Sequence, residues 1–233
     1  MNSHDPFTLA LSLILSGDPG LFGIIHLSLQ VSLSAVFVAS LIGLPLGAAI
    51  ALFRFPGRGL VITLLNALMG LPPVVAGLLV YLSLSRAGPL GQFGLLFTPT
   101  AMVIAQTLLV LPIIAALTRQ AIEDLWEEYR EQLQSLGSGR VRAIPTLLWD
   151  ARITLITAIL AGFGRASAEV GAVLIVGGNI EGVTRVMTTA IALETSKGDL
   201  PLALALGLVL LALVAAVNAT AYLLGQASRR HMQ

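Results

Sequence analysis

Two formal charges, Arg165 and Glu169, lie within a long apolar segment of the chain, about residues 153–176. Charge inside a membrane span is costly, so such residues usually face a polar cavity or pair with one another. On a continuous helix, side chains four residues apart lie one turn apart on one face and can form an ion pair. We expect this pair to shape or gate a polar pathway. The alternatives are a structural pair that locks two helices together, or a helix shifted towards the membrane interface.

Pro72 and Pro73 stand in the middle of another apolar segment, about residues 60–84. Two successive prolines remove two backbone donors and must distort a helix. The distortion could expose carbonyl groups to a pathway, or it could be a plain packing kink. We assign Pro72, Pro73, Arg165, Glu169 and Gly171 to the expected pathway or gate. Gly171 is included because a small residue beside the charged pair permits close helix packing.

The segment Thr184–Thr189 is polar and precedes a short helical pattern. Arg185, Thr188 and Thr189 could contact a protein that delivers a substrate outside the membrane. The alternative for these residues is an ordinary capped helix in a loop.

Residue types that catalyse reactions or bind metals are sparse and scattered. His4, His26 and His231 have no ligand spacing, and the chain has no cysteine. A metal site is therefore not expected. No Ser/His/Asp arrangement and no paired catalytic carboxylates are present, so the sequence predicts a protein that is not an enzyme by itself.

The composition is that of an integral membrane protein. Hydrophobic residues make up 56% of the 233 residues and charged residues 11%, whereas soluble domains carry roughly 25% charged residues. The mean hydropathy is +0.92. A span needs roughly 20 apolar residues, which predicts an all-α protein with five spans, at about residues 24–52, 60–84, 100–117, 153–176 and 200–224.

Residues 7–15 are apolar but too short to span, so we expect an interfacial helix that ends at Gly17-Asp18-Pro19. No basic residue precedes it and no cleavage site follows it, which argues against a signal peptide. The basic residues predict the orientation, because they are enriched on the cytoplasmic side. With the polar loop 118–152 inside, nine arginines are cytoplasmic and only Arg86, Arg185 and Lys197 are outside. The nine are Arg54, Arg58, Arg119, Arg130, Arg140, Arg142, Arg152, Arg229 and Arg230. The amino terminus is then outside and the carboxyl terminus inside, in a single domain over residues 1–233.

The loop 118–152 has the pattern of a helical elbow. Leu125, Tyr129, Leu133 and Leu136 recur at helical spacing among acidic residues. Gly137 and Gly139 are expected to end this helix, and Ser138 to cap a second one. The second helix has an apolar side made of Val141, Ile144, Leu147 and Leu148. We expect the elbow to dock a soluble partner; the alternative is a hairpin that only closes a loop.

At this elbow the sequence resembles the membrane subunits of ATP-binding-cassette importers. Their cytoplasmic signature is Glu-Ala-Ala, three residues, Gly, nine residues, then Ile-x-Leu-Pro. Here Glu131-Gln132-Leu133 precedes Gly137 by three residues, and Leu147–Asp150 takes the later place without the final proline. The resemblance implies a type I importer permease fold, whose ATPase-coupling residues would be Glu128, Glu131, Leu133, Leu136, Gly137, Ser138 and Gly139.

The resemblance extends along most of the chain. Leu71–Gly77 and Arg165–Val173 are similar to second-span and fourth-span motifs of molybdate, tungstate and sulfate permeases. Val176–Ile180, Thr184–Thr189 and Glu194–Asp199 are most similar to the tungstate type. Only residues 7–15 occupy the place where many molybdate permeases have a further span.

The resemblance also implies an assembly. It consists of a homodimer of this chain in the lipid of the cytoplasmic membrane, two ATPase subunits that bind ATP and Mg²⁺, and an extracytoplasmic binding protein. No cofactor on this chain and no nucleic-acid partner are expected. The implied substrate is tungstate, with molybdate, sulfate or another small solute as alternatives. Two other classes stay open: a carrier or channel without an ATPase, which would show an inverted repeat, and a membrane scaffold.

Overall fold

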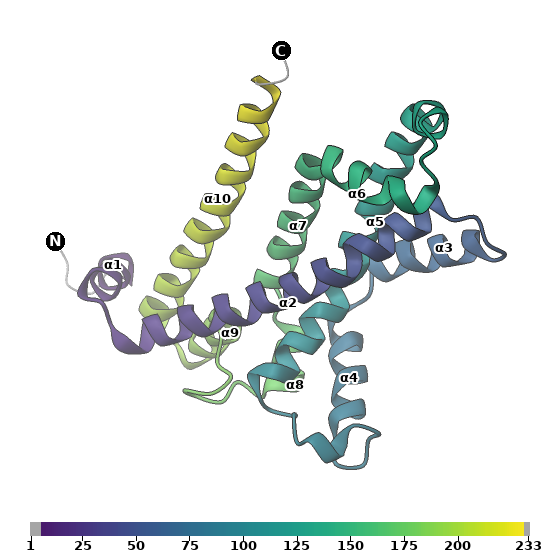
Figure 1. Ribbon diagram of the computed structural model, residues 1–233. Coiled ribbons are helices and arrows are strands. Elements are labelled where there is room, and N and C mark those ends of the chain that lie inside the picture. The colour runs from purple at the N-terminus through teal and green to yellow at the C-terminus, as the bar shows by residue number, and fades with distance from the viewer. Residues whose placement is uncertain (1–5, 231–233) are drawn as a thin grey trace. The chain divides into compact units, whose positions relative to one another are not determined.

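The computed structural model describes residues 6–230, with side chains for residues 7–220, and every long element in that range is a helix (Figure 1). The α-helices are α1 (Pro6–Ser16), α2 (Pro19–Leu52), α3 (Arg58–Met69), α4 (Pro73–Leu84), α5 (Pro99–Ser135), α6 (Arg140–Asp150), α7 (Arg152–Ser167), α8 (Gly171–Gly177), α9 (Met187–Lys197) and α10 (Leu200–Arg230). A short 3₁₀ helix, η1 (Gly91–Phe93), lies between α4 and α5.

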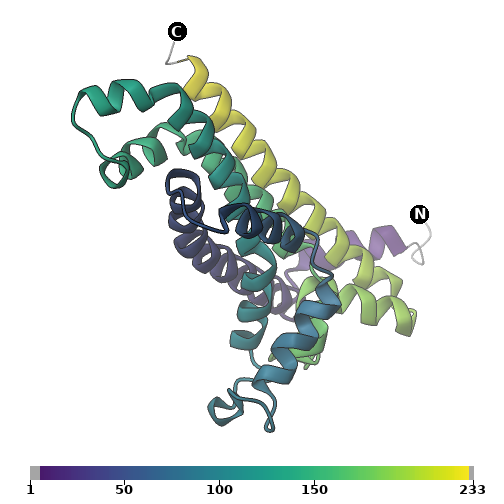
Figure 2. The same cartoon turned by 90° about the vertical axis from the view of Figure 1, so that its right-hand side faces the viewer.

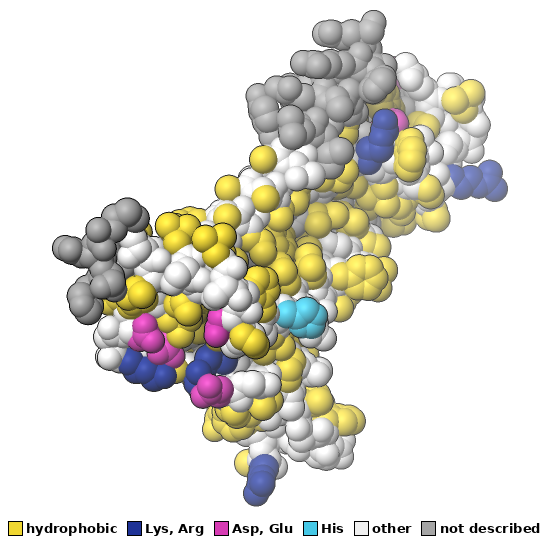
Figure 3. Space-filling model, turned by 90° about the vertical axis from the view of Figure 1, so that its left-hand side faces the viewer, with side chains coloured by type: hydrophobic (Ala, Val, Ile, Leu, Met, Phe, Trp, Pro, Cys, Tyr) yellow, Lys and Arg dark blue, Asp and Glu magenta, His cyan; other side chains and the backbone are white. Residues whose placement is uncertain are grey.

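Three of these helices are long and apolar enough to cross a membrane. They are α2, α5 and the first part of α10, with mean hydropathies of 2.3, 2.2 and 2.8. Two broken pairs, α3 with α4 and α6 with α7, raise the number of candidate spans to five if each pair counts as one. Large apolar side chains stay exposed, among them Phe37 and Leu41 on α2 at 68% and 67%. Figure 3 shows hydrophobic side chains over much of the face in view, with charged side chains in small groups. Such a surface requires lipid or a partner to cover it.

The chain forms two compact units that each draw on several segments. One unit contains the chain up to Ala35, Pro72–Gln106 and Ala166–Val217. The other contains Val36–Leu71, Thr107–Arg165 and the chain from Asn218 onwards. We call them the first and the second unit.

In the first unit, α4 packs side by side with α8 (Figure 1). A Cβ atom on Gly77 would lie 2.7 Å from the Cα atom of Ala172, so only glycine permits this approach. Helices α1, α2, α9 and α10 share an apolar core, whose buried members are Ala10, Leu21, Met187, Ala190, Ala205 and Leu206. Small side chains at several of these positions let the helices approach closely.

In the second unit, α2 packs against α5 at its glycines. A Cβ atom on Gly47 would lie 2.5 Å from the carbonyl oxygen of Ala115, and one on Gly43 would lie 3.1 Å from a methyl carbon of Ile114. The core that joins α2, α5, α6 and α7 is made of Ala48, Ala51, Leu52, Ile122, Ala143, Leu147, Ala151 and Leu155.

Several expected elements are present with the expected limits. The helix over residues 7–15 is found as α1, and Gly17 beyond it has a positive φ of 69°. The prolines interrupt the second apolar segment, because α3 ends at Met69 and α4 begins at Pro73, with Pro72 extended. The expected continuous helix over 153–176 is wrong. It is divided into α7 and α8 by a non-helical stretch from Ala168 to Val170.

Candidate functional site

The turn between α5 and α6 is a compact helix ending formed by Gly137. Gly137 has φ +72°, a left-handed conformation that favours glycine. Its N–H donates to the carbonyl of Gln134 at 3.0 Å, and the N–H of Ser138 donates to the carbonyl of Leu133 at 2.9 Å. This pair of bonds is the Schellman motif, which satisfies the last carbonyls of a helix. The turn and the two helices beside it stand at the upper left of Figure 2.

The inner face of this elbow is held by apolar packing. Leu125, Tyr129 and Leu133 on α5 pack against the buried cluster of the second unit. On α6, Leu147 is fully buried, and Ile144 packs against the same cluster. The elbow is therefore fixed to α2 and α7 through its own core, and Leu133 serves that packing.

The outer face of the elbow is exposed and mixed in character. Leu136, one of the expected ATPase-coupling residues, is 82% exposed, and Val141 on the apolar side of α6 is 65% exposed. Charged side chains on the same two helices, Glu128, Glu131, Arg140 and Arg142, are exposed as well. Trp149 is 70% exposed, and the Arg152 guanidinium lies 5.1 Å from its ring centroid. The elbow thus exposes the apolar side chains of Leu136, Val141 and Trp149 together with charged side chains of the same two helices.

Ser138 does not cap α6 as expected. The residue before the helix is Gly139, whose backbone is extended and which provides no side-chain hydrogen bond. Ser138 instead belongs to the turn, through its N–H bond to Leu133.

Arg58 anchors the elbow helix to the end of α2. Its guanidinium donates to the carbonyls of Ile50 and Ala51 at 2.8 and 3.3 Å, and to the Glu123 carboxylate at 2.8 Å. Arg119 also pairs with Glu123, one turn earlier on α5. Arginine can satisfy helix-terminal carbonyls and a carboxylate together, because its donors form a rigid fork. The sequence pattern of the elbow did not indicate this role, because Arg58 lies 65 residues from Glu123 along the chain.

Glu169 lies in the break between α7 and α8 and is only 2% exposed. Its Oε1 accepts a hydrogen bond of 2.9 Å from the N–H of Ala172, in the first turn of α8. Its backbone carbonyl accepts one of 2.7 Å from the Thr188 hydroxyl. Arg165 lies in the last turn of α7, where the helix dipole stabilises a positive charge. The two residues are not one turn apart on a single helix, because the helix ends at Ser167.

The structure brings several of the expected pathway residues together around Gly171. A Cβ atom there would lie 3.1 Å from Cγ2 of Val74, and 3.7 Å from both the Val74 nitrogen and Glu169 Oε1. The start of α4, where Pro72 precedes the helix and Pro73 is its first residue, thus lies against the start of α8 and near the Glu169 carboxylate. A Cβ atom at position 171 would require the Val74 side chain to shift by a few tenths of an ångström.

Of the three residues expected to contact a binding protein, Thr189 is internal. It is 1% exposed, and its hydroxyl accepts a hydrogen bond of 3.1 Å from the Val186 N–H at the start of α9, where it caps the helix. Thr188 is half-buried and bonded to Glu169. The Arg185 side chain is 15% exposed and lies 3.5 Å from the Glu181 carboxylate.

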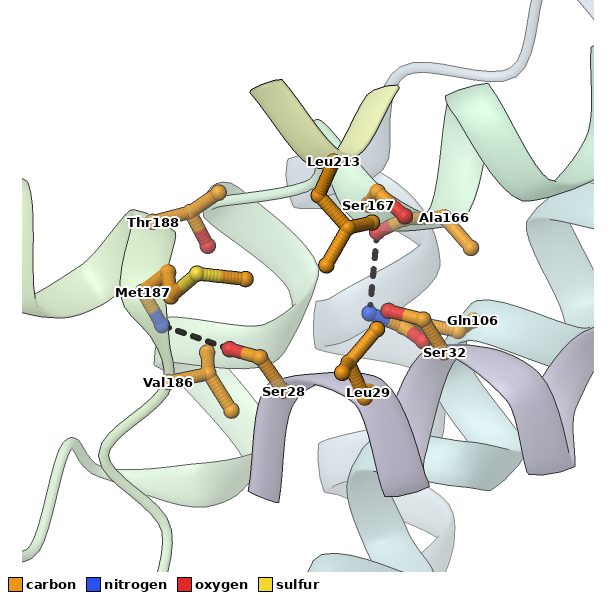
Figure 4. A pocket seen from close by; sticks show the side chains of 10 residues that line it. All are labelled: Ser28, Leu29, Ser32, Gln106, Ala166, Ser167, Val186, Met187, Thr188 and Leu213. Carbon is orange, nitrogen blue, oxygen red and sulfur yellow. Dashed lines mark hydrogen bonds between the residues drawn. The ribbon is translucent and has the colours of Figure 1, made fainter. Parts of the chain in front are cut away.

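A small polar pocket in the first unit was not expected from the sequence. It is lined by side chains from α2, α5, α7, α9 and α10, and Figure 4 shows them with the two hydrogen bonds between them. The Gln106 amide donates to the Ala166 carbonyl at 3.1 Å, and the Ser28 hydroxyl accepts from the Met187 N–H at 2.7 Å. The four-residue spacing of Ser28 and Ser32, and a glutamine within an apolar span, are the signals that could have indicated it.

His26 is the sole histidine in the described part of the chain, and His4 and His231 lie outside it. Among the described residues, no three histidine or acidic side chains gather as a metal site would require.

Helices broken within apolar segments, with a buried carboxylate at the break between α7 and α8, are features found in membrane transport proteins. Residues 43–231 match the family of binding-protein-dependent transport system inner membrane components. The chain belongs to this family, and it is the permease component of an importer of that type.

Relatives that align with most of the chain have names that specify the transported solute more closely than the family does. A tungstate uptake system permease protein of Peptoclostridium acidaminophilum is 44% identical, over 93% of this chain and 95% of the relative. A probable anion transporter permease protein of Haloferax volcanii is 43% identical, over 85% and 88%. A tungstate uptake permease of Campylobacter jejuni is 36% identical, over 92% and 90%.

Proposed function

We propose that this chain forms, as a homodimer, the transmembrane pathway for tungstate in an ATP-driven importer. The observation that carries the proposal is the 44% identity to a tungstate uptake permease over 93% of the chain. Substrate reaches the pathway on an extracytoplasmic binding protein, and a partner ATPase subunit binds ATP and Mg²⁺ and hydrolyses the nucleotide. Molybdate and sulfate are the competing anions.

The ATPase docks on the elbow. Exposed Leu136 and Val141 supply the apolar anchors, and the acidic and basic side chains around them supply the polar rim that interfaces commonly have. The buried inner face, built on Leu147 and the residues packed around it, transmits motion of the elbow to α2 and α7. An exposed surface on a rigidly packed support is the arrangement that coupling requires.

The chain crosses the membrane five times, with the amino terminus outside and the elbow inside. Because the chain has no cysteine, a single introduced cysteine shows by its labelling on which side of the membrane its loop lies. Ser138→Cys should react with a membrane-impermeant maleimide only in inside-out vesicles. Arg86→Cys should react only in right-side-out vesicles. Labelling of both positions from one side would contradict this orientation.

Pro72, Pro73, Glu169 and Gly171 line or control the pathway, together with Arg165. The support is the buried carboxylate at a break between two helices, next to the start of α4. Glu169→Gln, Arg165→Ala and the double variant should reduce tungstate uptake while the protein still inserts and dimerises. Normal uptake by all three would remove these residues from the pathway.

The transported anion is tested in vesicles that hold the dimer, its ATPase and its binding protein. Isotopically enriched tungstate accumulated inside is measured by mass spectrometry, with ATP and with a non-hydrolysable analogue. We expect ATP-dependent accumulation that excess molybdate reduces less than unlabelled tungstate does. Preferential accumulation of another anion would contradict tungstate as the substrate but would agree with the proposed class of ATP-driven importer. Accumulation without ATP would favour the carrier class.

A further inference from the structure

The pocket shown in Figure 4 is polar, uncharged and small. Its side chains carry four hydroxyls and one amide, from Ser28, Ser32, Ser167, Thr188 and Gln106. The three serines and Gln106 are each less than a tenth exposed. The enclosed space is about 10 Å³, and a cavity needs roughly 10–15 Å³ to hold one water molecule.

One polar atom in this pocket has no partner. Gln106 is 3% exposed, and its Oε1 is buried without a hydrogen bond. The orientation of the amide is determined by its other end, because Nε2 donates to the Ala166 carbonyl at 3.1 Å. Rotating the amide would place two acceptors, Oε1 and the Ala166 oxygen, against each other. The pocket therefore contains an acceptor that only a hydrogen-bond donor can satisfy.

These observations narrow the class of ligand. An oxyanion offers acceptors rather than donors, so it would leave Gln106 Oε1 unsatisfied. A cation would be buried among lining residues that carry no formal charge, and an unpaired buried charge is costly. A buried water molecule typically makes about three hydrogen bonds to otherwise unsatisfied groups. A serine hydroxyl can accept a hydrogen bond from the water or donate one to it.

The pocket lies beside the break between α7 and α8. There the Ala166 carbonyl accepts from the N–H of Glu169, three residues later, at 3.2 Å, as well as from Gln106. The carbonyl of Glu169, within the break, accepts a hydrogen bond from the hydroxyl of Thr188 on α9. Broken helices at membrane depth persist where neighbouring side chains and ordered water satisfy the released backbone groups.

We propose that this pocket holds one ordered water molecule, which donates a hydrogen bond to Gln106 Oε1 and helps to maintain the α7–α8 break. The inference does not depend on the identity of the transported anion. Gln106 is a positioning residue: it acts on the Ala166 carbonyl and on the water.

The direct test is a density map of the intact dimer, at a resolution that shows ordered water, in sodium buffer and in choline buffer. We expect a peak at roughly 2.7–3.2 Å from Gln106 Oε1 in both. A dry pocket, or a protein donor bonded to Oε1, would overturn the proposal. A peak present only with sodium would assign a cation instead.

The second test is Gln106→Leu, which removes the acceptor and fills the space. The variant should expel the water, and it also removes the hydrogen bond from Gln106 to the Ala166 carbonyl. We then expect an unfolding temperature roughly 2–4 °C lower or more, and no peak in the map. Gln120→Leu, at an exposed position of the same helix, should not lower it. Because the variant also removes the hydrogen bond to Ala166, the lower unfolding temperature alone does not demonstrate bound water, and the map of the variant decides. A water peak that persists in Gln106→Leu would overturn the role of Gln106 Oε1.

Discussion

At Gly47, helix α2 lies so close to α5 that one added methyl group cannot be accommodated. The Cβ atom of Gly47→Ala would stand 2.5 Å from the Ala115 carbonyl oxygen, which is backbone and cannot rotate away. We expect a loss of roughly 1–3 kcal/mol from overpacking, measured as a lower unfolding temperature in detergent. Gly23→Ala, on the same helix with nothing within 4 Å, is the control and should be neutral or slightly stabilising. Equal effects at both positions would contradict the close contact.

Glu123 is the carboxylate on which two arginines converge. Glu123→Gln removes the charge that faces Arg58 and Arg119 while keeping the shape of the side chain. Hydrogen bonds to charged groups contribute about 1.5–3 kcal/mol, so we expect a loss towards the lower end, since these side chains are partly exposed. Chemical denaturation of the purified protein measures it. Asp124→Asn, next to it and exposed, should have little effect, and a comparable loss there would show that Glu123 has no special role.

Among the elements, the elbow turn depends on the backbone conformation of a single residue, Gly137. Gly137→Val forces a β-branched side chain into a left-handed conformation that costs non-glycine residues roughly 1–2 kcal/mol. Gly137→Asn should be tolerated, because asparagine adopts this conformation more readily. Hydrogen exchange over residues 131–145 should accelerate in the valine variant only. Similar protection in both variants would mean that the turn does not require glycine.

The sequence was sufficient for those elements whose ends depend on local chemistry. Gly137 and the pair Pro72-Pro73 interrupt helices through their own backbone restrictions, which need no knowledge of distant residues. The break after Ser167 could not be predicted in this way. At this break the Glu169 carboxylate accepts a hydrogen bond from the Ala172 N–H, and the helical spacing of the charged residues gives no sign of that bond.

The polar pocket was missed for a related reason. Gln106 meets the Ala166 carbonyl across 60 residues of sequence, and Ser28 meets Met187 across 159. Neither pairing leaves a periodic signal within one segment. Sequence patterns indicated where the helices lie, and the tertiary contacts decided which polar groups they bring together.

For the whole molecule, the apolar exposed surface and the broken spans are consistent with a permease that works in an assembly. Exposed Phe37, Leu41 and Leu211 require lipid or a second copy to cover them. We expect the purified chain to have the mass of a homodimer by native mass spectrometry in mild detergent. A monomer at all concentrations, with full transport activity in vesicles, would contradict that assembly.

The most direct test of the central claim is ATPase activity in proteoliposomes of the complete importer, titrated with binding protein that carries tungstate, molybdate or sulfate. The account predicts stimulation by the tungstate-loaded binding protein at low concentration. It also predicts that Gly137→Val abolishes this stimulation while basal hydrolysis and complex assembly persist. Stimulation that survives Gly137→Val would contradict the role of the elbow. The absence of any ATPase bound to this chain would contradict the importer assembly.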